Sequence, residues 1–162
     1  MAGTCAEVPA AWRSLYSRFG AGNDTLWIYQ GSREVFRSQA AGIMPLMEYL
    51  ERFSENWGEI TVFDKVLGNA AALLALKAGC TLALSPLGSQ LAVETLDAHR
   101  VEYYIASVVP HIQQANSDEV CPMESLSVGR EPEDLYEAVK RLLHTGKKRD
   151  LACPSPAESR PG

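Results

Sequence analysis

The spacing of apolar residues changes along the chain and divides it into predicted elements. Residues 25–29 and 34–38 are short β-rich runs, and the four residues between them have the length of a hairpin loop. From residue 45 onward, segments with helical spacing (45–53, 65–78 and 89–99) alternate with apolar strands (59–63, 80–84 and 101–105). This order predicts an α/β fold, a mixed sheet with an N-terminal β-hairpin and three parallel strands joined by right-handed crossovers.

Three further segments complete the expected organisation. Residues 10–19 can form a short amphipathic helix within an N-terminal extension, residues 1–20. Residues 110–126 form a long irregular segment, and such segments are usually either functional or disordered. A last helix begins at Pro132 and ends before Gly146. We therefore expect one domain over residues 21–146, followed by a disordered tail over residues 147–162.

Charge and cysteine content exclude several classes of function. The net charge of −5 argues against binding to nucleic acid or to an anionic membrane surface. The four cysteines form no Cys-x-x-Cys pair, which makes a zinc knuckle or a thioredoxin-type motif unexpected. The N-terminus has no signal-peptide pattern, and no apolar run reaches the ~20 residues of a membrane helix. We expect a cytoplasmic protein with free thiols.

The predicted helix over residues 65–78 carries the strongest functional signal. It is apolar all round at residues 70–76, which is typical of a buried helix, and its polar residues gather at its start. Asp64 either caps the helix or accepts a hydrogen bond from a ligand. Lys65 is either solvated or ion-paired, or it holds an anion together with the free N–H groups of the helix. Gly68 allows close packing or close approach of a ligand, and Asn69 is a candidate hydrogen-bonding residue.

Four short motifs in this chain resemble those of one protein family. The run DKVLGNAAALL at residues 64–74 resembles the D-K-x-x-G-x-A-A-A signature of domain-of-unknown-function family 1893. The segments GIMPL (42–46), VVPHI (108–112) and CPME (121–124) are similar to further motifs of that family. The resemblance covers residues 25–126. It implies a cytidine deaminase-like fold, a three-layer α-β-α sandwich, and it implies no established reaction.

The zinc site of the cytidine deaminases is missing from this sequence. Those enzymes need His-x-Glu at the start of one helix and Pro-Cys-x-x-Cys at the start of the next. At the corresponding helix starts this chain has AGIMP (41–45) and DKVL (64–67), and neither segment contains any of the required ligands. We therefore expect no metal site, no cofactor and no deamination by a zinc-bound hydroxide.

Three hypotheses on function remain. The first is that the protein binds a small anionic or nucleotide-like ligand at the start of the predicted helix over residues 65–78. The ligand-binding residues would be Gly42, Asp64, Lys65, Gly68, Asn69, Cys121 and Glu124. The second is a metal-independent enzyme acting on a nucleotide or a related small molecule, with Asp64 or Glu124 as acid–base and Cys121, near His111, as nucleophile. The third is a scaffold or regulatory subunit that forms a homo-oligomer, which an exposed apolar patch on the helix over residues 46–53 or 135–142 would favour.

Overall fold

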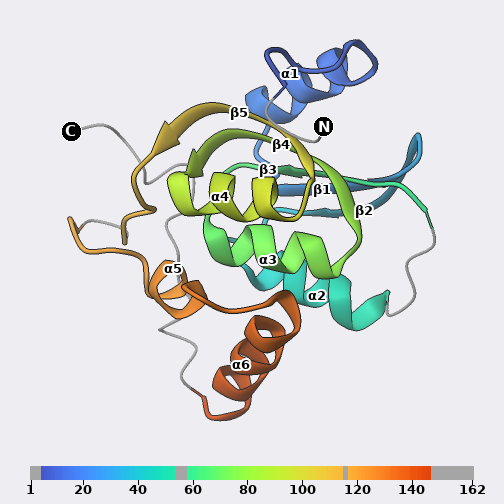
Figure 1. Cartoon of the computed structure of the whole chain (residues 1–162). Coiled ribbons are helices and arrows are strands. Elements are labelled where there is room, and N and C mark those ends of the chain that lie inside the picture. Colours follow the sequence, from blue (N-terminus) through green and yellow to red (C-terminus); the bar gives the residue numbers. More distant parts are fainter. Residues whose placement is uncertain (1–4, 54–57, 115–116, 147–162) are drawn as a thin grey trace.

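In the computed structural model, the protein folds around a single mixed sheet (Figure 1). The structure describes residues 5–53, 58–114 and 117–146. The sheet runs in the order β2-β1-β3-β4-β5. Its strands are β1 (Leu26–Gln30), β2 (Arg33–Ser38), β3 (Ile60–Asp64), β4 (Cys80–Ser89) and β5 (Glu102–Val109). β1 lies antiparallel to β2 and β3, whereas β3, β4 and β5 are parallel. The predicted mixed sheet, with its hairpin and three parallel strands, is confirmed.

Helices cover the two faces of the sheet unequally (Figure 1). The short 3₁₀ turn η1 (Ala10–Trp12) leads into α1 (Arg13–Ala21), which lies on one face. On the other side of the sheet lie α2 (Met44–Arg52), α3 (Asn69–Lys77), α4 (Gln90–Ala98), α5 (Pro122–Ser127) and α6 (Pro132–His144), of which α5 and α6 pack on α3. No helix in the described part of the chain is long and apolar enough to cross a membrane.

Strand alternation in β1 separates two hydrophobic cores. Leu26 and Ile28 point to the face of α3, and Trp27 and Tyr29 point to the face of α1, because successive side chains of a strand leave the sheet on opposite sides. The core beneath α1 is rich in aromatic rings. Phe19 is fully buried there, so the N-terminal helix is packed on the sheet rather than extended away from it.

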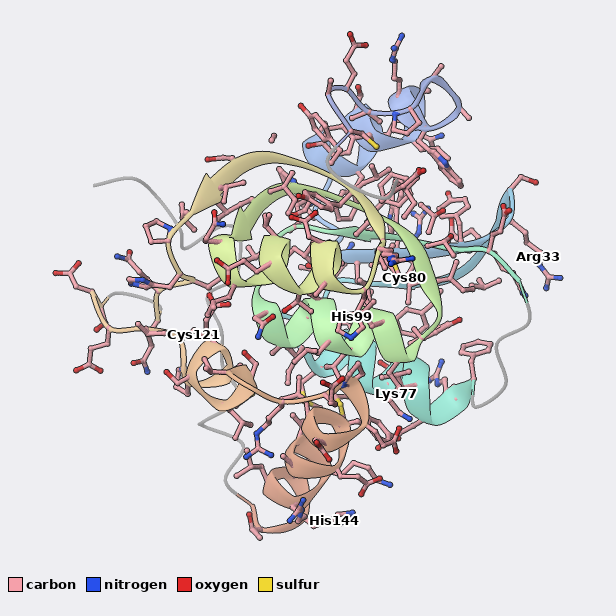
Figure 2. The ribbon with its side chains drawn as sticks, viewed as in Figure 1. Arg33, Lys77, Cys80, His99, Cys121 and His144 are labelled. Carbon is pink, nitrogen blue, oxygen red and sulfur yellow. The ribbon has the colours of Figure 1, made fainter. Side chains whose placement is uncertain are left out.

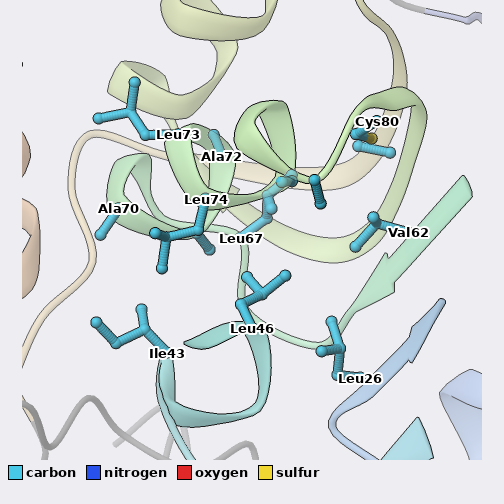
Figure 3. Packing of buried hydrophobic residues seen from close by; sticks show 14 of the residues in the cluster. Leu26, Ile43, Leu46, Val62, Leu67, Ala70, Ala72, Leu73, Leu74 and Cys80 are labelled. Atoms are coloured by element: carbon cyan, nitrogen blue, oxygen red, sulfur yellow. The ribbon is translucent and has the colours of Figure 1, made fainter. Parts of the chain in front are cut away.

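Helix α3 lies at the centre of the larger core, as its apolar sequence predicts. Residues 69–75 are all buried, and the helix contacts α2, α4, α5 and α6. Figure 3 shows Leu74 of α3 above Leu46 of α2, with Leu26 of β1 nearby. The start of α3 is therefore surrounded by other elements and positioned by them.

Several predicted boundaries are wrong. Helix α3 begins at Asn69, not at Lys65, because Leu67 forms a β-bridge with Gly88 and Gly68 is extended. Leu67 donates its N–H to the Leu87 carbonyl and accepts from the Ser89 N–H, so this segment pairs with a β4 that is longer than predicted. Strand β5 is also longer, and α5 occupies part of the segment that was expected to be irregular. The predicted tail at 147–162 lies outside the described residues.

Candidate functional site

A small pocket opens at the start of α3, beyond the end of β3. It has a cavity volume of about 30 Å³. All seven predicted ligand-binding residues line it, although they come from three separate stretches of the chain, at residue 42, residues 64–69 and residues 121–124. The lining also includes Thr25, Ile43, Val66, Ala70, Ala71, Ile112 and Met123. Ile43, the N-cap of α2, and Ala70 of α3 are both labelled in Figure 3. The location agrees with the rule that ligands of open α/β sheets bind beyond the carboxyl ends of the strands.

Asp64 supplies a buried carboxyl group at this pocket. It is the last residue of β3 and only 9% exposed. Its Oδ1 accepts from the Val66 N–H at 3.2 Å, and within the described residues Oδ2 has no donor. Burial raises the pKa of Asp64 to about 7, and the hydrogen bond from Val66 lowers it only in part. The expected capping role is wrong, because Gly68 is the N-cap of α3. Asp64 is thus free to interact with a ligand.

Glu124, at the start of α5, is fixed by three hydrogen bonds. Its Oε1 accepts from the Asn69 N–H at 2.7 Å and from the Ser89 hydroxyl at 2.8 Å. Its Oε2 accepts from the Ile112 N–H. The side chain is 2% exposed. This carboxylate therefore joins the starts of α3 and α4, since Ser89 also caps α4 by accepting from the Ala92 N–H. Its contacts are structural, and it adds a fixed negative charge beside the pocket.

The side chain of Asn69 is engaged inside the protein and not available to a ligand. Its amide nitrogen donates to the Ser127 hydroxyl at 2.9 Å, and its amide oxygen accepts from Thr95. Gly68 is a site of close packing. A Cβ at this position would lie 3.1 Å from Ile112 Cγ1 and 3.5 Å from Glu124 Oε1. For both Asn69 and Gly68, the contacts therefore favour a structural role over contact with a ligand.

Lys65 also differs from the expected anion-binding role. Its ammonium donates to the carbonyls of Gly22 at 2.8 Å and Gly20 at 3.3 Å, at the end of α1. It also lies 5.1 Å from the centre of the Phe19 ring. A cation at a helix C-terminus stabilises the helix dipole. Lys65 therefore holds α1 against the sheet, and its charge is directed to the face opposite α3.

Backbone donors take the place that was expected for the lysine. The first N–H groups of a helix have no partner within the helix. The Asn69 N–H is bound by Glu124, but no group in the described residues accepts from the N–H of Ala70 or Ala71. Both residues are 4% exposed and line the pocket. Buried N–H groups without a partner are rare, and they indicate a site for an acceptor.

Cys121 is a poor candidate for a nucleophile. It is 1% exposed, and it is not one of the free cysteines of the described residues, which are Cys5 and Cys80. The expectation of a free thiol at this position is therefore wrong. His111 is not among the residues that line the pocket. Figure 2 shows Cys121 at the start of α5 and Cys80 at the other end of α3. In the described ranges, no group of three His, Cys, Asp or Glu side chains is arranged to hold a metal ion.

Sequence reasoning missed the two amides of Ala70 and Ala71, as well as Thr25 and Ser89. Backbone donors leave no mark in residue identity, so only their place in the first turn of a helix could have indicated them. The predicted first turn lay four residues too early. Ser89 is the first residue of the predicted helix over residues 89–99, and in the structure it is the N-cap of α4; a serine at a helix start is a recognisable capping signal.

Fold and pocket together define a single-sheet α/β domain with a buried carboxyl group beside the start of a central helix. The chain belongs to the family described as domain of unknown function (DUF1893), which matches residues 15–143. The predicted family resemblance is confirmed. The crystal structure of a DUF1893 family protein (TM1506) from Thermotoga maritima is similar to 83% of this chain and 92% of that chain, with 26% identity and a TM-score of 0.74. No protein with a curated function matches this chain.

Proposed function

We propose that this protein binds a small anionic or nucleotide-like molecule in the pocket at the start of α3. One observation carries the proposal: the unpartnered N–H groups of Ala70 and Ala71 line the same pocket as the buried Asp64 carboxyl. Helix N-termini attract anions because their free N–H groups and the helix dipole act in the same direction. The donors in this proposal are backbone amides, and Lys65 takes no part.

The pocket size limits how a ligand binds. A cavity of about 30 Å³ is one-fifth of the roughly 150 Å³ that holds a benzene ring in a protein core. Only a terminal group of a few atoms fits inside, and the remainder of a larger ligand lies outside the pocket. This restriction favours a carboxylate or phosphate oxygen, or the edge of a base, as the group that enters.

The fold belongs, in our proposal, to the cytidine deaminase-like class without its zinc site. The order of strands and helices and the position of the pocket at the start of α3 support this relationship. Helix α2 begins with Met44 and Pro45, and α3 begins with Asn69 and Ala70. These residue types cannot provide the His-x-Glu and Cys-x-x-Cys ligands that a zinc deaminase uses at two helix starts.

A metal-independent enzyme is the second candidate. Its specific support is the Asp64 carboxyl, because a pKa of about 7 suits a general acid or base at neutral pH. Glu124 is less suited, since three donors fix its carboxylate. Conversion of a bound ligand that stops in Asp64→Asn would distinguish turnover from binding.

The scaffold hypothesis stays a proposal with less support. Leu46 and Leu50 of α2 and Leu135 and Val139 of α6 are buried within their own chain. Met44, at the start of α2, and Phe53, after its end, are each 37% exposed, and these two side chains lie at opposite ends of the helix rather than in one patch. Size-exclusion chromatography with light scattering would test for a homo-oligomer.

An amide-resolved NMR titration tests the binding proposal. Nucleotides, sugar phosphates and small carboxylates are added to ¹⁵N-labelled protein, and the resonances of Ala70, Ala71 and Gly42 are followed. Binding at the pocket shifts these signals in the wild type. Asp64→Leu fills the cavity with an apolar side chain and should abolish the shifts, whereas the exposed control Glu59→Gln should preserve them. Ligand-induced shifts confined to other regions would show that the site is wrong.

A further inference from the structure

We propose that the group entering this pocket is a carboxylate, and that Asp64 binds it as the protonated acid, so that one proton is taken up with the ligand. This inference rests on the proposed function and names its ligand chemistry. Asp64 would donate its hydroxyl to one carboxylate oxygen, and the N–H groups of Ala70 and Ala71 would donate to the ligand oxygens. At a pH at which Asp64 is ionised in the free protein, the proton comes from the solvent.

The helix start already binds one carboxylate in this structure. Glu124 Oε1 accepts from the Asn69 N–H at 2.7 Å, which is the first amide of α3. The next two amides, of Ala70 and Ala71, line the adjoining pocket and have no acceptor within the described residues. A second carboxylate would therefore meet the same kind of donor, with the same favourable helix dipole. The arrangement is built for an oxyanion of small size.

The charges around Asp64 decide its protonation state when an anion binds. The stretches that border the pocket before α2 and along α3 contribute only uncharged side chains: Thr25, Gly42, Ile43, Asn69, Ala70 and Ala71. From the segment before α5 and from α5 come Ile112, Cys121, Met123 and the Glu124 carboxylate. Lys65 borders the pocket, but its ammonium is bound to carbonyls at the end of α1. No cation in the described residues therefore faces Asp64 to offset the negative charges of Asp64, Glu124 and an anionic ligand.

Protonation of Asp64 removes this conflict. Two carboxyl groups in contact share a proton, because like charges at that distance cannot both be ionised without a large cost. Burial already raises the pKa of Asp64 to about 7, so that the acid form is well populated at neutral pH. The ligand is then held by three donors and faces one fixed negative charge, that of Glu124.

Two small probes of nearly equal shape test the inference. Acetate is a carboxylate, whereas acetamide is neutral and carries its own donor. The shifts of the Ala70 and Ala71 amide resonances are measured with each probe between pH 5.5 and 8.5 at constant ionic strength. We expect acetate to bind, and its dissociation constant to rise about 30-fold from pH 5.5 to pH 8.5, as follows from a group titrating near pH 7. Acetamide should bind more weakly than acetate at pH 5.5.

Asp64→Asn is the decisive variant because its amide nitrogen is a permanent donor in the place of the acid hydroxyl. It should retain acetate binding and lose the pH dependence. His111→Asn is the matched control, since His111 adjoins Ile112 without lining the pocket, and it should preserve the pH dependence. Acetate binding that is independent of pH in the wild type, or that is lost in Asp64→Asn, would overturn the inference. Nucleotides binding at Ala70 and Ala71 without acetate would overturn it and leave the proposed function standing. Absence of any shift at these amides would refute both.

Discussion

Replacing Asp64 with Asn should stabilise the protein, and increasingly so as the pH rises. Burial moves the pKa of Asp64 from its ordinary value of 3.8 to about 7 in the folded protein. The unfolded chain therefore loses its proton at a lower pH than the folded protein does. The free energy of unfolding contains a contribution that is fully present below pH 3.8 and is lost as the pH rises to 7. Asn does not titrate in this range, so the variant lacks this loss.

The magnitude follows from the two pKa values. At about 1.4 kcal/mol per pKa unit, the full loss is about 4 kcal/mol, and about 2–3 kcal/mol of it falls between pH 5 and pH 8. Asn retains an oxygen to accept from the Val66 N–H, so this local contact is conserved.

The assay is urea-induced unfolding of wild type and Asp64→Asn at pH 5, 6, 7 and 8. The difference in the free energy of unfolding should grow by about 2–3 kcal/mol across this range. The control variant Glu59→Gln alters an exposed carboxylate and should follow the wild type. Parallel pH profiles for wild type and Asp64→Asn would refute the argument that Asp64 is buried without a counter-charge.

Three other substitutions separate the structural contacts from the proposed binding role. Lys65→Met should lower the free energy of unfolding by about 1–3 kcal/mol and accelerate amide exchange in α1, because the carbonyls at the end of α1 lose a charged donor. Ligand-induced shifts at α3 should persist in this variant. Their loss would contradict the structural role that we assign to Lys65. Glu124→Ala should lower the free energy of unfolding in urea by about 3 kcal/mol or more, since three buried donors lose their acceptor. Glu124→Gln should lower it less. Equal values for the two variants would argue against these hydrogen bonds. Gly68→Ala should cost about 1 kcal/mol because its methyl group would press on Ile112, and a gain in melting temperature would show that the neighbour gives way.

The sheet could be predicted from the sequence because its determinants are local. A short run of β-prone apolar residues marks β1, and the continuous apolar run of α3 marks a helix that is buried on all sides. The start of α3 could not be predicted in the same way. Leu67 stays extended because it pairs with Gly88, and this partner becomes visible only when β3 and β4 lie side by side.

The composition of the pocket was predicted better than the roles of its residues. Polar side chains near a helix start indicated the right place, and the motif around Glu124 supplied its far wall. The direction of each side chain depends on tertiary contacts. Lys65 turns to the end of α1, and Asn69 turns to Thr95 and Ser127, since these partners lie next to it only in the folded chain. The residue types alone did not distinguish a ligand contact from an internal one.

The bond between Glu124 and Asn69 has a consequence for the newly made chain. The two residues are 55 positions apart, and Ser89 lies 35 positions before Glu124. At roughly 5–20 residues per second, the ribosome needs roughly 3–11 s to proceed from one residue to the other. During this interval the starts of α3 and α4 have no acceptor from α5. The final cooperative step of folding must therefore await synthesis of α5, and chains that terminate after β5 should remain substrates for chaperones and proteases.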